Sequence, residues 1–168
     1  WRDHSLFENT FKGDLTNNFT EKHKFKAGVE LRFQNIQMVD IVDPWFKPLG
    51  LNNDIYRVNP ALGAFYAQDN LSLKGMIINF GLRFDYWFPG KFVDETIALP
   101  SSETNVSDAI RTAYLNETFN LFGHRWKGRM SPRLGISHPV SDNQTLFFSY
   151  GHFSKLPRPQ FVYAKLAS

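Results

Sequence analysis

The segment Met76-Ile-Ile-Asn-Phe-Gly-Leu-Arg-Phe-Asp-Tyr-Trp-Phe88 decides the fold of this chain. Every even position in it is apolar or aromatic, whereas the odd positions include the charged residues Arg83 and Asp85. A period of two over this length predicts a β-strand with one apolar face and one polar face. The segment is longer than the ~5–6 residues of an ordinary globular strand. It is long enough for a tilted strand that crosses a bilayer, which needs ~9–11 residues.

Five further segments alternate in the same way, and the links between neighbouring segments differ sharply in length. These segments are Leu6–Asn17, His23–Val39, Ala61–Leu73, Arg129–Val140 and Gln144–Phe153. The links are short at Asn17–Lys22, Lys74–Gly75 and Ser141–Asn143, and they are long at Asp40–Pro60 and Pro89–Gly128. Short turns at one end and long loops at the other are typical of an outer-membrane β-barrel. We therefore predict an all-β fold, an antiparallel up-and-down meander of about six strands that forms a section of a transmembrane β-barrel.

Six strands are too few for a closed membrane barrel, because bacterial single-chain barrels have at least ~8 strands. An open sheet in lipid would leave unpaired backbone groups at both edges. We therefore expect residues 1–168 to be one partial barrel whose closing strands lie in further polypeptide. The sequence starts at Trp1 without a basic or apolar leader, so any signal peptide is expected outside it. Its end at Ala167–Ser168 is expected to fall in another long loop.

The composition excludes several classes of protein. There are no cysteines, which excludes disulfides and thiolate metal sites. The net charge of +3 is spread along the chain rather than gathered in a basic block, so no nucleic-acid partner is expected. No run approaches the ~18 apolar residues of a membrane helix. Aromatic residues make up 16% of the chain, which suits a wall with a large apolar lipid side.

The alternation assigns each strand side chain to one of two faces. The face expected to contact outer-membrane lipid contains Leu31, Phe33, Phe80, Leu82 and Phe84. In Ala61–Leu73 the apolar set also includes Asp69. The opposite face is expected to line the lumen and contains Glu30, Arg32, Arg83, Asp85 and Arg133. These charges either pair with each other and with material inside the barrel or line a ligand path, and we favour the structural role.

Two hairpins resemble a known family. The first is Phe65-Tyr-Ala-Gln-Asp69, a tight turn, and Asn79-Phe-Gly-Leu-Arg-Phe-Asp85. The second is Ser131-Pro-Arg-Leu-Gly135, Pro139-Val-Ser-Asp142 and Phe148-Ser-Tyr-Gly-His-Phe153. Both resemble barrel hairpins of TonB-dependent outer-membrane receptors, in particular the branch with carboxypeptidase-regulatory-like N-terminal domains.

The resemblance implies a plugged barrel of about 22 strands. It also implies import of a scarce nutrient, driven by the TonB complex. The partners that it implies are the outer-membrane lipid, the remainder of the barrel, its plug, and the TonB complex. The plug, the TonB box and the closing strands are expected outside residues 1–168.

Chemistry of other kinds is not indicated. The sequence has no catalytic motif and no nucleotide-binding loop, so we expect neither an enzyme nor a cofactor. The histidines are scattered without the spacing of metal ligands. Asp40, Asp43 and Asp54 lack the spacing of a calcium loop, and we interpret them as part of a solvated loop.

The long loops supply candidate ligand contacts. Exposed aromatic rings can stack on sugars or hold apolar ligands, and the candidates are Trp45, Phe46, Tyr114 and Trp126. The alternative, which we favour, is that these rings pack the loops against one another. A short helix is predicted at Asp108–Asn116, because Asp or Ser can cap its start.

The leading hypothesis is a section of a TonB-dependent transporter that imports a siderophore, vitamin, glycan or peptide. The first alternative is a passive porin or an adhesin barrel. The second is a secreted soluble β-sandwich that binds a ligand. The bacterial outer membrane is the expected location.

Overall fold

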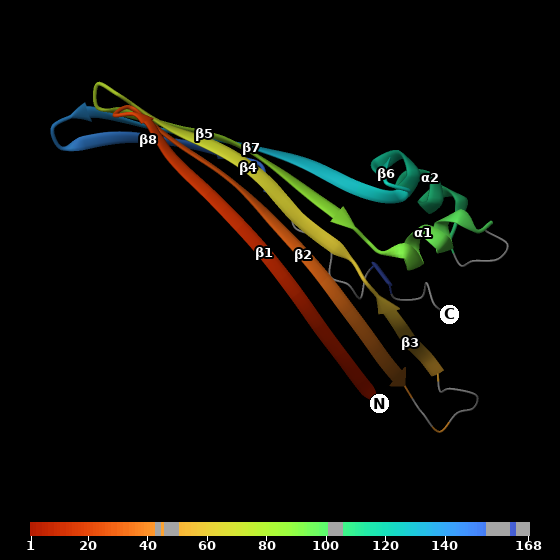
Figure 1. Ribbon diagram of the computed structural model, residues 1–168. Coiled ribbons are helices and arrows are strands. Elements are labelled where there is room, and N and C mark those ends of the chain that lie inside the picture. The colour runs from red at the N-terminus through yellow and green to blue at the C-terminus, as the bar shows by residue number, and fades with distance from the viewer. Residues whose placement is uncertain (43–44, 46–50, 101–105, 154–161, 164–168) are drawn as a thin grey trace.

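The computed structural model describes residues 1–42, 45, 51–100, 106–153 and 162–163, and it contains one antiparallel sheet with two short helices at one end (Figure 1). The strands are β1 (Arg2–Thr20), β2 (His23–Val42), β3 (Leu51–Val58), β4 (Ala61–Leu73), β5 (Met76–Phe88), β6 (Phe119–Leu121), β7 (His124–Ser141) and β8 (Gln144–Gly151). The helices are α1 (Lys91–Ala98) and α2 (Asp108–Glu117).

The six long strands form the predicted meander. Each of β1, β2, β4, β5, β7 and β8 pairs antiparallel with the next one in this order. The short turns between β1 and β2, β4 and β5, and β7 and β8 gather at one end of the sheet (Figure 1). In the β4–β5 turn both Lys74 and Gly75 have positive φ, at 43° and 85°. That is the backbone of a type I′ hairpin, whose twist matches the twist of its strands.

The register separates the side chains into two chemically distinct faces. Residues paired across neighbouring strands point to the same side of a sheet, so each set follows from the strand pairs. The apolar face contains Phe11, Leu15, Phe25, Ala27, Val29, Leu31, Phe33, Phe65, Ala67, Leu71, Phe80, Leu82, Phe84, Tyr86, Met130, Leu134, Ile136, Phe148 and Tyr150. The polar face contains Lys12, Asp14, Lys24, Lys26, Glu30, Arg32, Tyr66, Gln68, Asn79, Arg83, Asp85, Arg129 and Arg133. The predicted grouping of side chains by face is confirmed.

β3 is an element that the sequence analysis missed, because residues 51–58 were assigned to a long loop. It pairs with the Ile36–Val42 end of β2, whereas β4 pairs with the His23–Phe33 part of the same strand. Between the two lies Pro60, which has no N–H to donate, and its carbonyl accepts a hydrogen bond from the Gln34 N–H at 3.0 Å. β3 and β4 are therefore two pieces of one line of strand, interrupted at a proline.

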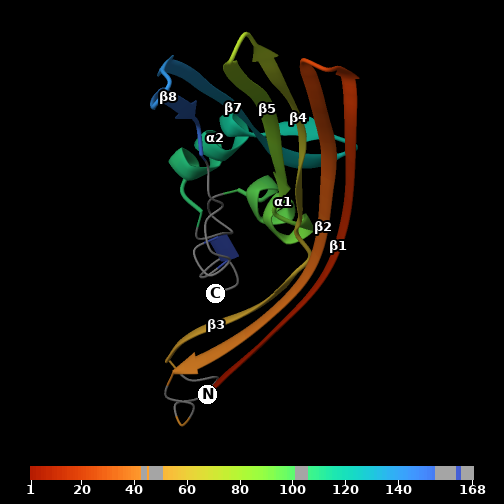
Figure 2. The same cartoon turned by 90° about the vertical axis from the view of Figure 1, so that its left-hand side faces the viewer.

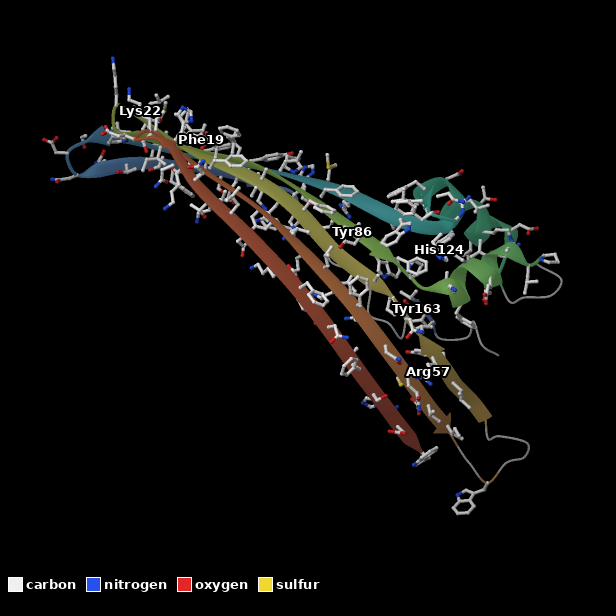
Figure 3. All side chains as sticks on the ribbon, viewed as in Figure 1. Phe19, Lys22, Arg57, Tyr86, His124 and Tyr163 are labelled. Carbon is white, nitrogen blue, oxygen red and sulfur yellow. The ribbon has the colours of Figure 1, made fainter. Side chains whose placement is uncertain are left out.

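The end of the sheet opposite the turns carries a compact cap. The predicted helix is confirmed as α2, where the Ser107 side chain accepts a hydrogen bond from the Ile110 N–H at 3.4 Å. α1 was not predicted, and it follows Gly90, whose φ is 106°. The buried core lies here rather than along the sheet, and it consists of Ile36, Tyr56, Val58, Val93, Ile97, Val106 and Tyr163. Figure 3 shows Tyr163 and His124 at this end, and Phe19 and Lys22 at the turn end.

One edge of the sheet is β1 and the other is formed by β8 and the short β6, both paired with β7, and the sheet curls between these edges (Figure 2). Among the described residues, β1 pairs with β2 alone and β8 pairs with β7 alone. Neither of the two helices in the described part of the chain is long and apolar enough to span a membrane.

Candidate functional site on the polar face

The register brings the predicted charged residues together on the polar face. Lys12, Glu30, Asp85 and Arg129 lie in one row across β1, β2, β5 and β7, with Ala64 of β4 between the carboxylates. Residues two apart on a strand share a face, so Arg32 and Arg83 lie beside the carboxylates of this row. The strand pairing thus converts scattered charges into a single cluster.

The charges of the cluster are paired along each strand. The Arg32 Nε donates a hydrogen bond to Glu30 Oε1 at 2.8 Å on β2. The Arg83 Nε donates to Asp85 Oδ1 at 2.8 Å on β5. The side chains of these two pairs are between 16% and 38% exposed. Each ion pair holds its guanidinium group beside the carboxylate two residues away on the same strand.

A third contact joins β1 to β4 across β2. The Tyr66 hydroxyl donates a hydrogen bond to Asp14 Oδ1, and Lys12 Nζ lies 3.6 Å from Asp14 Oδ2. The Tyr66 ring lies over Gly28, where a Cβ would overlap it. Sequence analysis did not single out Tyr66 or Asp14, although the alternation places both on the polar face.

Several cations in the part of the polar face nearer the short turns have no carboxylate partner in the described structure. Lys26 and Arg133 lie in one row, and Lys24 lies nearer the turns. The Arg133 guanidinium lies 5.3 Å from the centre of the Phe153 ring. A pocket of about 220 Å³ opens among Lys12, Glu30, Tyr66, Arg83 and Arg133. This part of the face has an excess of positive charge and suits an anionic group.

The predicted loop aromatics occupy different environments. Trp45 is 91% exposed, and Phe46 lies outside the described residues. Trp126 stacks on Tyr86 and Phe88 at centroid distances of 5.8 and 5.2 Å, so its ring belongs to the apolar side of the sheet. Tyr114 packs against the buried core of the cap.

Asp94 of α1 joins the parts of the cap, a role that no motif or spacing in the sequence indicates. Its carboxylate accepts hydrogen bonds from the Tyr114 hydroxyl of α2 at 3.3 Å and from the Arg125 N–H of β7 at 3.2 Å. The His124 Nδ1 lies 3.6 Å away. Burial, followed by the charge of Asp94, raises the pKa of the Tyr114 phenol above its ordinary value of 10.0. This carboxylate therefore holds α1, α2 and the start of β7 in one arrangement.

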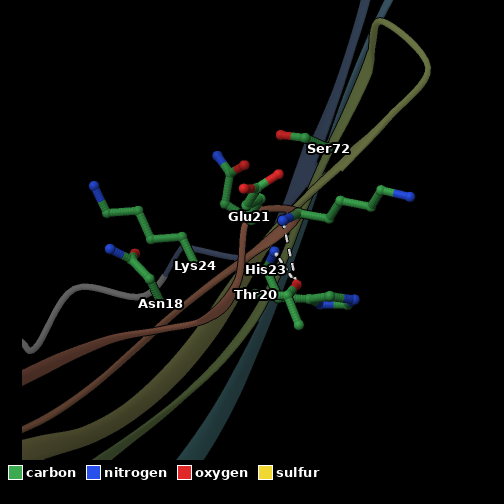
Figure 4. A pocket seen from close by; sticks show the side chains of 8 residues that line it. Asn18, Thr20, Glu21, His23, Lys24 and Ser72 are labelled. Atoms are coloured by element: carbon green, nitrogen blue, oxygen red, sulfur yellow. Dashed lines mark hydrogen bonds between the residues drawn. The ribbon is translucent and has the colours of Figure 1, made fainter.

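The turn end of the sheet has an open polar pocket of about 610 Å³ (Figure 4). The Thr20 Oγ1 accepts hydrogen bonds from the N–H groups of Lys22 and His23, both at 3.2 Å. Lys24 and Ser72 complete this rim. The group is that of a solvated turn, with no set of catalytic side chains among the residues drawn.

Metal ligation finds no support in the described ranges, where no group of three or more His, Asp or Glu side chains converges. Asp40, one of the carboxylates considered for calcium, was expected in a solvated loop, but it lies in β2 opposite Asp54 of β3, and it is paired with Arg2 at 2.8 Å. Asp43 lies outside the described residues.

Comparison with protein families identifies one match. The model of the family described as TonB dependent receptor-like, beta-barrel, matches residues 2–165. No curated protein and no solved structure matches the chain.

Proposed function

Because this chain belongs to the TonB-dependent receptor β-barrel family, we propose that it forms part of the wall of a transporter that imports a scarce nutrient across the bacterial outer membrane. The family is one of outer-membrane transporters, and the antiparallel meander of long strands agrees with a section of such a barrel. The solute belongs to the siderophore, vitamin, glycan or peptide class.

The observation that carries the proposal is the exposed apolar face. Phe11, Phe65, Phe80 and Leu82 are 62%, 51%, 50% and 45% exposed, although they lie in the middle of paired strands. A soluble domain rarely exposes an apolar surface of this extent. In a membrane barrel the same side chains contact lipid. The apolar face is therefore assigned to the bilayer and the polar face to the lumen.

The polar face then lines the interior of the barrel. In our proposal Glu30, Arg32, Arg83, Asp85 and Arg133 line the lumen. The Glu30–Arg32 and Arg83–Asp85 pairs have a structural role in this proposal, because in each pair the carboxylate and the guanidinium neutralise one another. Arg133, which has no carboxylate partner in the described structure, is left to meet the plug or a passing anion.

The open edges of the sheet need further strands to pair with them. The backbone N–H and C=O groups on the outer sides of β1 and β8 have no strand partner among the described residues. Each unpaired group in lipid costs several kcal/mol. We propose that further strands pair with both edges, that a plug fills the lumen, and that the TonB complex contacts a segment outside residues 1–168.

The long-loop end is assigned to the outside of the cell, where the solute arrives. Of the loop aromatics, Trp45 has its ring exposed, and we propose it, together with Phe46, the next residue in the sequence, as a solute contact. Tyr114 and Trp126 contribute through the shape of the cap, since both rings are already packed.

An uptake experiment tests the proposal. Cells that carry the complete gene are compared with cells that lack it, in backgrounds with and without TonB, for accumulation of labelled ferric siderophores, corrinoids, oligosaccharides and peptides. We expect one class to accumulate only when both genes are present. Uptake that persists without TonB would identify a passive porin, and a protein that fractionates away from the outer membrane would reject the proposal.

A further inference from the structure

The apolar face contains a groove with a carboxylate in it. The groove has a volume of about 430 Å³, and its apolar wall includes Phe25, Phe80, Leu82 and Leu134. Asp69 is the one carboxylate and Arg133 the one cation among the groove residues, and the register assigns the Arg133 side chain to the opposite, polar face. The strand register places Asp69 directly between Phe25 of β2 and Phe80 of β5. A charged group on this face needs an explanation, because charges on the lipid side of a barrel are costly.

The surroundings of Asp69 do not depend on strands outside this sequence. β4 is paired on both sides, with β2 and with β5, and β5 is paired in turn with β7. The groove lies over these four interior strands, away from the open edges at β1 and β8. The strands that form it are therefore all paired on both sides within this sequence.

Only half of the Asp69 carboxylate is satisfied. Oδ2 lies 2.8 Å from His23 Nδ1. Oδ1 is buried and accepts no hydrogen bond from any described residue. A carboxylate oxygen without a donor is unfavourable in an apolar setting. The torsion that turns a carboxylate about its Cβ–Cγ bond is soft, so a donor that enters the groove can meet this oxygen after a small rotation.

The position of the groove indicates what the donor is. Asp69 lies two residue pairs inside the His23–Leu71 pair, close to the short turns, and the apolar rows of β5 continue from Phe80 away from the turns. On the proposed function, which puts the short turns at one membrane surface, we assign this position to the border between the hydrocarbon of a leaflet and its headgroups. A ligand that fits has an acyl chain for the groove and a cationic N–H donor for the carboxylate.

We propose that this groove binds a phospholipid whose headgroup carries a primary ammonium, with the ammonium on Asp69 and an acyl chain along Leu82 and Leu134. The attraction is strong because both groups lie at the border of a low-dielectric region. His23 holds the other carboxylate oxygen and so orients the site. The inference rests on the proposed function, since it needs the apolar face to contact the outer membrane.

Lipid selectivity of the full-length wild-type protein is the first test. The purified protein is stripped of lipid and placed in nanodiscs with equal amounts of phosphatidylethanolamine, phosphatidylcholine and phosphatidylglycerol. Lipids retained after mild detergent extraction are counted by native mass spectrometry. Phosphatidylcholine is the critical comparison, because its quaternary ammonium has the same charge and no N–H. One charge-assisted hydrogen bond corresponds to about tenfold preferential retention of phosphatidylethanolamine.

Asp69→Asn is the matched variant, because it keeps the shape of the side chain and removes the charge. We expect the preference for phosphatidylethanolamine to disappear in this variant and to persist in Asp69→Glu. Asp142→Asn is the control, since Asp142 is an exposed carboxylate in the β7–β8 turn at the same end of the sheet. This variant should retain lipid as the wild type does.

Equal retention of the lipids by the wild type would overturn the proposal. It would mean that the contact with His23 is the only polar interaction that the Asp69 carboxylate needs. Unchanged preference in folded Asp69→Asn would overturn it as well. If Asp69→Asn does not assemble, the wild-type comparison of the two ammonium lipids decides alone. TonB-dependent uptake is measured in the same strains. Normal uptake without lipid preference rejects the lipid site only, whereas absence from the outer membrane rejects the proposed function.

Discussion

Gly63 lies under the ring of Tyr86, and the two residues are paired across β4 and β5. A Cβ at position 63 would overlap both the Tyr86 ring and the backbone oxygen of Glu30. The Tyr86 hydroxyl donates a hydrogen bond to that same oxygen at 3.2 Å. The glycine thus makes room for a ring that extends from β5 across β4 to β2, and this contact ties three strands together.

Replacing Gly63 with Ala is expected to destabilise the barrel by ~1–3 kcal/mol, because the added methyl group forces the Tyr86 ring or the backbone to move. The full-length protein is heated in detergent, and the temperature at which its folded gel mobility is lost is recorded. Gly13→Ala is the control, since a Cβ there meets Val29 at an ordinary 3.7 Å. Equal transition temperatures for the two variants would refute the packing role of Gly63.

Leu82→Arg is expected to block assembly, because Leu82 lies on the apolar face and an arginine near the bilayer midplane costs ~2–4 kcal/mol. The measurement is the amount of full-length protein at the cell surface. Gln68→Arg is the control, because it adds the same charge on the polar face of β4, which is paired with β2 and β5. This variant should assemble. Normal surface levels of Leu82→Arg would contradict the assignment of the faces.

Asp94→Ala is expected to loosen the cap. The substitution removes the acceptor of the Tyr114 hydroxyl and of the Arg125 N–H, and a hydrogen bond to a charged group contributes ~1.5–3 kcal/mol. Limited proteolysis of the folded full-length protein should cut residues 91–123 several-fold faster. Glu95→Ala, at the exposed neighbouring position of the same helix, is the control. Equal cleavage rates for Asp94→Ala and Glu95→Ala would show that Asp94 does not hold the cap together.

Alkaline solution is expected to open the cap before it affects the strands. Burial, followed by the nearby Tyr56, raises the pKa of the Tyr163 phenol above its ordinary value of 10.0. The unfolded segment therefore loses its proton first. The stability contributed by the neutral phenol is complete below pH 10 and falls as the pH rises further.

Proteolysis of the cap between pH 8 and pH 11 measures this effect. In Tyr163→Phe the rate of cleavage should depend less on pH. The cap of this variant should also be less stable at every pH, because it lacks the hydrogen bond to the Pro89 carbonyl, which is 2.7 Å long in the wild type. Tyr150→Phe, at an exposed position of β8, is the control. A pH profile that Tyr163→Phe leaves unchanged would exclude Tyr163 as its source.

The predicted strands agree with the structure because each is governed by its own alternation. Met76–Phe88 has the same bounds as β5, and Ala61–Leu73 has the same bounds as β4. β1, β2 and β7 extend beyond their predicted ends, where the alternation of apolar and polar residues weakens and partner strands, rather than the local pattern, maintain the ladder. β8 ends at Gly151, two residues before the predicted end at Phe153. The fold class was available from these patterns, and the family from the resemblance of two hairpins.

The cap could not be predicted in the same way. α1 and β3 have weak local patterns, and each exists because it packs against something distant in sequence. Tyr163 fills the space beside Tyr56, with their ring centres 5.5 Å apart. The role of Asp94 also depends on residues from two other elements, so no spacing in the sequence announces it.

The sequence by itself determined the strands, their two faces, the sorting of short and long connections, and the family. The strands, faces and connections follow from a period of two and from turn chemistry, which act between near neighbours, and the family follows from the resemblance of two hairpins. Only the tertiary structure decided which charges meet, because pairing across strands depends on register. It placed Lys12 opposite Glu30 and Asp69 between two phenylalanines, since a shift of one residue in any pair would have moved every side chain of that strand to the other face.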